Sequence, residues 1–172
     1  VYMGDFDLDA YRDEDKALEL FTAGAELDDA RSNFELSWGY YYGRLAKADY
    51  TLAYKYSNAC LEAYHGCKNR AALMLENGWG VPKDIDAAIA LYKEGMEAGR
   101  HAATANLATL LKKMSADARR AGRDQVAIAL GQEALATAYK AKGLGSEKAY
   151  PNELLGDIYH KGISGVPSDL EK

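Results

Sequence analysis

The sequence has little of what marks several common protein classes. Proline occurs three times in 172 residues, too seldom for a disordered or linker-like chain. Charged residues interrupt every apolar stretch well short of the roughly 18 residues that a transmembrane helix needs. Basic residues are not in excess, since 21 of them stand against 26 acidic ones. A nucleic-acid-binding surface is usually basic, so we expect neither a nucleic-acid partner nor a membrane span.

The acidic excess is concentrated near the N-terminus. Residues 1–30 hold ten acidic and two basic residues. A signal peptide would carry basic residues before an apolar run, so we expect no leader in this chain, and the start at Val1 leaves room for one removed earlier. The segment is interpreted as a solvated face, and the alternative is a docking surface for a basic partner.

One pattern recurs along the chain. An aspartate precedes an alanine-rich amphipathic segment at Asp13, Asp49, Asp84 and Asp124, and a truncated copy starts at Asp169. The successive offsets are 36, 35, 40 and 45 residues. Aspartate is a good N-cap because its carboxylate accepts N–H bonds from the first helical turn. Each copy therefore predicts the start of a helix.

A second helix precedes each of these segments. Its pattern, L-G-x-x-Y-x-x-G, occurs in varied form at 36–43, 71–78, 107–114 and 155–162. In two copies a Gly-Val-Pro turn follows, and Gly78 stands where a helix ends in a left-handed conformation. A helix pair of this length cannot bury its apolar face alone and must stack on its neighbours, which predicts an all-α solenoid.

The repeat landmarks set the expected boundaries. We predict a partial unit at 1–28, units at about 30–66, 67–100 and 101–143, and a partial unit at 146–172. The predicted helices cover 13–28, 30–45, 49–65, 68–79, 84–99, 101–120, 124–142 and 149–162.

These units resemble Sel1-like repeats, which are relatives of the tetratricopeptide repeats. The residues that carry the resemblance are LGDIYHKG at 155–162, the turns at 80–84 and 165–169, and DxxxAxxLYxxGxxAG at 84–99. The resemblance covers nearly the whole chain, with more divergent units at 30–66 and 101–143. It implies a right-handed α-solenoid of stacked helix-turn-helix Sel1-like repeats that serves mainly as an adaptor for protein–protein contact.

Two cysteines lie seven residues apart. Cys60 falls near the end of one predicted helix and Cys67 near the start of the next, so their Cα atoms can come within bridging range. The segment also resembles the cysteine-rich branch of the family known from Helicobacter, although here the pair is one residue closer and occurs in one unit. A disulfide would indicate a periplasmic or secreted location. The alternatives are two reduced cysteines, compatible with a cytoplasmic location, or a metal site with His65 at a spacing that matches no common zinc pattern.

Nothing in the sequence indicates catalysis. The resemblance to the cysteine-rich branch raises a β-lactam or cell-wall enzyme as one interpretation, but S-x-x-K, S-D-N and K-T-G are all missing. The three histidines, His65, His101 and His160, fall in different units. We therefore expect no enzyme and no cofactor.

The resemblance implies that the first helix of each unit lines a concave face. The side of that helix opposite the repeat Leu and Tyr positions forms a stripe of candidate partner-binding residues. The stripe consists of Glu35, Trp38, Tyr42, Arg70, Leu73, Asn77, Asn106, Thr109, Lys113, Leu154, Asp157 and Lys161.

Trp38 and Tyr42 are the expected anchors of this stripe for a protein or peptide partner, because aromatic residues are favoured at interfaces. The alternative for both is packing between repeats.

A specialised version of the adaptor function is an immunity or inhibitor protein that neutralises a secreted toxin. The acidic N-terminal end would suit a basic toxin. The basic hairpin at 112–123 is interpreted as an extended, solvated helix, and the alternative is a second place for a partner, in this case an acidic one. The sequence does not predict the oligomeric state.

Overall fold

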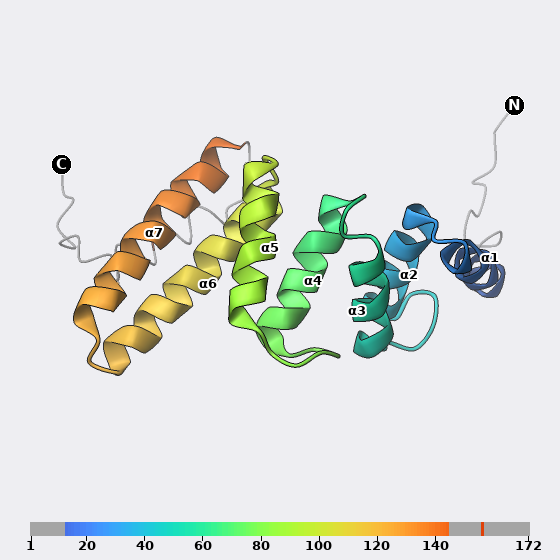
Figure 1. Cartoon of the computed structure of the whole chain (residues 1–172), viewed down its shortest axis with the longest axis horizontal. Coiled ribbons are helices and arrows are strands. Elements are labelled where there is room, and N and C mark those ends of the chain that lie inside the picture. Colours follow the sequence, from blue (N-terminus) through green and yellow to red (C-terminus); the bar gives the residue numbers. More distant parts are fainter. Residues whose placement is uncertain (1–12, 145–155, 157–172) are drawn as a thin grey trace, which may run out of the picture. The chain divides into compact units, whose positions relative to one another are not determined.

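The computed structural model describes residues 13–144 and Gly156. This part of the chain folds into seven α-helices without a strand (Figure 1). The helices are α1 (Glu14–Glu26), α2 (Ala30–Tyr42), α3 (Tyr50–Ala59), α4 (His65–Asn77), α5 (Ile85–Glu97), α6 (His101–Arg120) and α7 (Asp124–Gly143). The predicted all-α class is confirmed. Most of the predicted helix at 149–162 lies outside the described residues, and so does the candidate binding residue Asp157.

The chain divides into two compact units, Val1–Lys83 and Asp84–Lys172. In the first unit, α1 packs on α2, and α2 packs on both α3 and α4. In the second, α6 packs on α5 on one side and along the length of α7 on the other. No helix among the described residues is long and apolar enough to cross a membrane.

Aspartates begin most of the helices, as the repeat pattern predicts. The carboxylates of Asp13, Asp49 and Asp84 each accept the N–H three residues ahead. The fourth copy corrects the prediction, because Arg123 is the N-cap of α7 and Asp124 is its first residue. The turn at Gly122, with φ 69°, brings the chain into the helix one residue early. The Asp124 carboxylate still lies in the first turn, at the positive end of the helix dipole.

The junction between α3 and α4 differs from the predicted one. Helix α3 ends at Ala59 instead of continuing to residue 65, and α4 begins at His65 instead of residue 68. The cause is a tight turn in which the Cys60 carbonyl accepts N–H bonds from Ala63 and Tyr64. The turn ends α3 and places Cys67 in the first turn of α4.

The turn after α4 lies close to the start of α3. Gly78 ends α4 with a φ of 73°, as predicted, and Gly80 follows with a φ of 70°. A Cβ atom on Gly80 would lie 2.2 Å from the Tyr50 carbonyl group. The turn after α4 therefore packs directly against the start of α3, and only glycine fits there.

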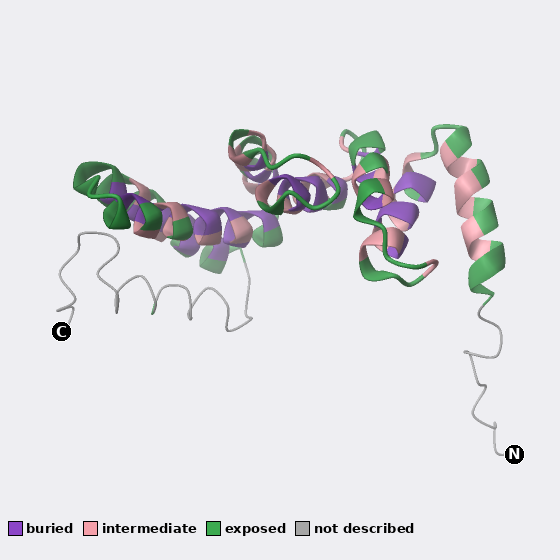
Figure 2. Ribbon diagram, turned by 90° about the horizontal axis from the view of Figure 1, so that it is seen from below, coloured by how far each residue is buried: buried purple, intermediate pink, exposed green. Residues whose placement is uncertain are grey.

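Each unit has its own apolar core, and Figure 2 shows the buried residues of both units in purple. In the first unit Leu36, Ala53 and Met74 are fully buried, and in the second Tyr92 and Leu107 are. Helix α1 has no buried residue at all. The core therefore lies along α2–α4 and α5–α7, while α1 presents mostly exposed side chains.

Candidate functional site

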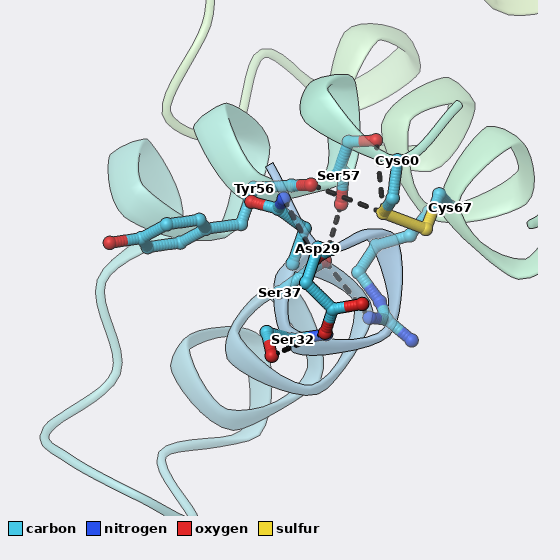
Figure 3. The surroundings of a disulfide bond; sticks show 9 residues. Asp29, Ser32, Ser37, Tyr56, Ser57, Cys60 and Cys67 are labelled. Atoms are coloured by element: carbon cyan, nitrogen blue, oxygen red, sulfur yellow. Dashed lines mark hydrogen bonds between the residues drawn. A yellow bond between two sulfur atoms is a disulfide. The ribbon is translucent and has the colours of Figure 1, made fainter. Parts of the chain in front are cut away.

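Arg70 is the centre of a buried polar group between α2 and α4. Its expected place on a solvent-facing stripe is wrong, because the residue is only 6% exposed. Nη1 of Arg70 donates to Ser37 Oγ at 3.0 Å, and Ser37 Oγ is hydrogen-bonded in turn to Ser57 Oγ on α3 (Figure 3). Arg70 therefore links α4 to α2 and is not part of the exposed surface.

Aromatic rings surround the Arg70 guanidinium. Its carbon Cζ lies 4.5 Å from the centroid of the Trp38 ring, 5.7 Å from that of Phe34 and 5.8 Å from that of Tyr41. Burial lowers the pKa of Arg70, and Tyr42, Tyr41 and Glu35 act in the opposite direction. Arginine stays protonated throughout. Ring faces and one hydroxyl thus stabilise a buried charge that would otherwise be costly.

Five aromatic residues form a continuous cluster around one end of α2, and we call them the aromatic cluster: Trp38, Tyr41, Tyr42, Tyr50 and Trp79. Ring centroids lie 4.5 Å apart for Trp38 and Tyr42, 4.8 Å for Tyr41 and Tyr42, and 5.6 Å for Tyr50 and Trp79. Tyr41 also contacts Tyr50 and Trp79. The side chains of Tyr42, Tyr50 and Trp79 are 53%, 42% and 37% exposed. The cluster therefore joins a half-buried base at Trp38 to an exposed aromatic surface.

Sequence reasoning missed Tyr50 and Trp79. The available signal was Trp79 itself, a tryptophan in the Gly-Val-Pro turn where the other copy has Ser164. Tyr50 offered no such signal. Its place in the cluster depends on the turn at Gly80, which packs against the Tyr50 backbone.

A pocket of about 560 Å³ lies between α1 and α2, beside Trp38. We call it the α1–α2 pocket, and it is lined by Asp13, Glu14, Ala17, Phe21, Glu35, Trp38, Gly39, Arg44 and Leu45. Three carboxylates thus face one guanidinium. The Arg44 Cζ lies 5.8 Å from the Trp38 centroid and 5.7 Å from that of Tyr42. The pocket therefore combines an aromatic wall with an excess of negative charge.

The other candidate residues of the stripe are dispersed. Leu73 is half-buried, and its carbonyl accepts a hydrogen bond from Nδ2 of the exposed Asn77. Asn106, which is half-buried, and Lys113, which is exposed, lie on α6 in the second unit. The first unit thus brings together Trp38, Tyr42 and Arg70 of the predicted set, with Leu73 and Asn77 further along α4.

Cys60 and Cys67 are joined by a disulfide in this structure (Figure 3). Their Cα atoms are 5.8 Å apart, and both residues are buried. The bond links the C-cap of α3 to the first turn of α4. Among the described residues, no three His, Cys, Asp or Glu side chains are grouped as a metal site requires.

The basic hairpin at 112–123 is the end of one long helix, as the extended-helix interpretation predicts. Helix α6 continues to Arg120, whose guanidinium forms an ion pair with Asp117. The turn that follows contains Gly122.

The family model described as Sel1 repeat matches residues 2–29, 30–58, 67–99 and 153–172. Residues 101–143 are outside these matches, and their assignment to a divergent unit stays a prediction. No curated protein matches the sequence.

Several solved structures are similar to this one, including the following two. A Sel1 repeat protein from Oxalobacter formigenes has a TM-score of 0.64 and 25% identity over 92% of this chain. A protective antigen of uropathogenic Escherichia coli with an SLR fold has a TM-score of 0.51 and 24% identity over 86% of it. The chain spans 60% and 37% of the lengths of these two proteins. The predicted fold, a solenoid of repeated helix pairs, is confirmed by the likeness to both.

Proposed function

Because the chain belongs to the Sel1 repeat family, we propose that it is a scaffold whose first unit binds a protein or peptide partner through the aromatic cluster and the adjoining α1–α2 pocket. Sel1 repeat proteins generally mediate protein–protein interactions, and their repeat scaffold is generally non-catalytic. The proposal for this chain goes further, because it assigns the contact to particular residues.

The observation that carries the proposal is the exposure of three aromatic residues of one cluster, Tyr42, Tyr50 and Trp79. The rings of Tyr50 and Trp79 stack on each other, and the Tyr41 ring contacts both of them and Tyr42. Exposing several large aromatic side chains side by side to water is unfavourable in free energy. Such exposed apolar patches commonly mark sites of contact with another molecule. Tyrosine, tryptophan and arginine are also the residues that contribute most to binding energy at interfaces. The exposed part of the aromatic cluster, with Arg44 beside it, has this composition.

The packing beneath the surface supports the same proposal. Arg70 and Ser37 join α4 to α2 under Trp38, and the disulfide joins α3 to α4. A surface held in place before binding loses less conformational entropy when the partner arrives. The aromatic cluster therefore stands on a rigid base.

The disulfide further supports a periplasmic or secreted location, because such bonds persist in oxidising compartments. A specialised form of the proposal is a protein that neutralises a secreted toxin. The acidic side chains of α1 favour a basic toxin in that case.

Site-specific photo-cross-linking tests the proposed contact. Tyr42 is replaced by a photoreactive phenylalanine in the cells that produce the protein, and Val126, which is 46% exposed on α7 in the second unit, is replaced in the matched control. We expect a discrete cross-linked protein from position 42 that mass spectrometry identifies. Equal cross-linking from both positions, or none from position 42, would contradict the proposal.

A further inference from the structure

We propose that the α1–α2 pocket receives an arginine or lysine side chain from a basic segment of the partner. This inference rests on the proposed function and names the chemistry of the group that is bound.

The charge of the pocket selects a cation. Asp13 and Glu14 come from the start of α1, and Glu35 faces them from α2, whereas Arg44 is the one basic residue of the lining. Among the described residues, Glu35 forms an ion pair with Arg31, whereas Asp13 and Glu14 form none. A positive group in the pocket would therefore gain favourable interactions with carboxylates that no cation of the described residues neutralises.

The apolar wall fits the rest of a basic side chain. Phe21, Trp38 and Leu45 line the pocket with the carboxylates. Arginine and lysine pack their aliphatic stems on such surfaces while the charged end stays near water. A volume of about 560 Å³ leaves space for one such side chain and its neighbours.

The Trp38 ring already accepts guanidinium groups. Cζ of Arg70 lies 4.5 Å from its centroid and Cζ of Arg44 lies 5.8 Å from it. A cation near an aromatic face is attracted by the charge distribution of the ring. The aromatic wall of the pocket therefore already makes cation–π contacts within this chain.

The surroundings favour a basic partner over an acidic one. Helix α1 carries Asp15, Glu19 and Glu26 beyond the pocket, with Lys16 as its single basic residue. These charges attract a positive segment and speed its approach. An acidic partner would need exposed cations here, but Arg70 is buried and leaves Arg44 alone in the lining.

Peptide binding to the full chain tests the inference. The probe is a fluorescein-labelled twelve-residue peptide of glycine and serine with four arginines, and its counterpart carries four glutamates. Fluorescence anisotropy gives the Kd of each. We expect the arginine peptide to bind and the glutamate peptide to bind at least about tenfold more weakly.

A matched pair of double variants separates the pocket from general charge attraction. Glu14→Gln with Glu35→Gln removes two pocket carboxylates, while Asp15→Asn with Glu19→Gln removes two carboxylates of α1 that do not line the pocket. Both pairs change the net charge equally. We expect the first pair to raise the Kd of the arginine peptide about tenfold or more and the second to change it less than about threefold. Glu14 is exposed, so we expect Glu14→Gln alone to leave the fold unchanged. This single variant should also weaken binding of the arginine peptide.

Four results would overturn the inference. They are an equal loss with both pairs, a preference for the glutamate peptide, no binding of the arginine peptide, and a dimer that the pocket variants convert to monomer, which would make a second copy the occupant. In the first three cases, cross-linking from Tyr42 still decides the scaffold proposal, so the two can fail separately.

Discussion

The guanidinium of Arg70 lies 4.5 Å from the centroid of the Trp38 ring. This contact joins the first helices of two successive helix pairs, α2 and α4. It places Trp38 in two roles, since the same ring packs on Arg70 and lines the α1–α2 pocket. Packing between repeats and the proposed partner contact are therefore combined at Trp38, whereas Tyr42, at 53% exposure, packs near the surface on Trp38, Tyr41 and Arg44.

The different exposure of these two residues predicts different effects of truncation. Trp38→Ala removes the ring from Arg70 and should lower the free energy of unfolding by about 2–4 kcal/mol. Tyr42→Ala should change it by about 0.5 kcal/mol, as exposed substitutions usually do, yet weaken partner binding by about 2 kcal/mol. Urea denaturation and a binding titration measure the two quantities. A stable Trp38→Ala variant would remove the packing role from Trp38.

Two substitutions of Arg70 separate its packing from its charge. Arg70→Ala should lower the free energy of unfolding by about 2–4 kcal/mol, because the guanidinium and its stem fill the space under Trp38. Arg70→Met keeps much of the volume, and Ser37 keeps Ser57 as a hydrogen-bond partner, so we expect a loss of about 1 kcal/mol or less. Thermal melting of the two variants side by side measures the difference. Equal losses would show that the charge itself stabilises the α2–α4 contact.

The Cys60–Cys67 bond predicts a specific change in mass. Alkylation alone should leave the intact mass unchanged, and alkylation after reduction should add two adducts. Reduction should also lower the free energy of unfolding by about 2–2.5 kcal/mol, the value expected for a loop this short. Free thiols in protein purified under oxidising conditions would remove the argument for a periplasmic or secreted location.

Two aspartates that look alike in the repeat pattern should differ in their contribution to stability. Asp84 caps α5 and accepts the Ala87 amide at 2.9 Å, so Asp84→Ala should cost about 1 kcal/mol. Asp124 lies inside the first turn of α7 and contributes through the helix dipole alone, so Asp124→Ala should cost about 0.3–0.6 kcal/mol. Chemical denaturation of the two variants at low salt compares them. A larger loss at Asp124 would contradict the described start of α7.

Features that depend on neighbouring residues in the chain were predictable. The caps at Asp13, Asp49 and Asp84 and the end of α4 at Gly78 involve contacts within a few residues. The helices from 13 to 143 were therefore predicted nearly in full, apart from the α3–α4 junction and the end of α2, which lies at Tyr42 instead of residue 45 because Gly43 adopts a left-handed conformation. The error at the α3–α4 junction arose because the hydrophobic pattern continues past Ala59 while the Cys60 carbonyl already closes a turn.

The candidate site was predicted only in part. Trp38 and Tyr42 were identified because they share one face of a single helix. The burial of Arg70 and the contribution of Tyr50 and Trp79 were not, since each depends on a contact with another helix or turn. The α1–α2 pocket also escaped sequence reasoning, because its walls come from two helices and the loop after α2.

The amino-acid sequence by itself determined the repeated helix pairs, their caps and turns, and the acidity of the N-terminal end, because helix periodicity, capping and net charge are local properties. Only the tertiary structure decided that Arg70 is a buried link and that the exposed aromatic surface extends from Tyr42 to Trp79. Residues separated by some forty positions had to meet before their burial, contacts and accessible surface were defined.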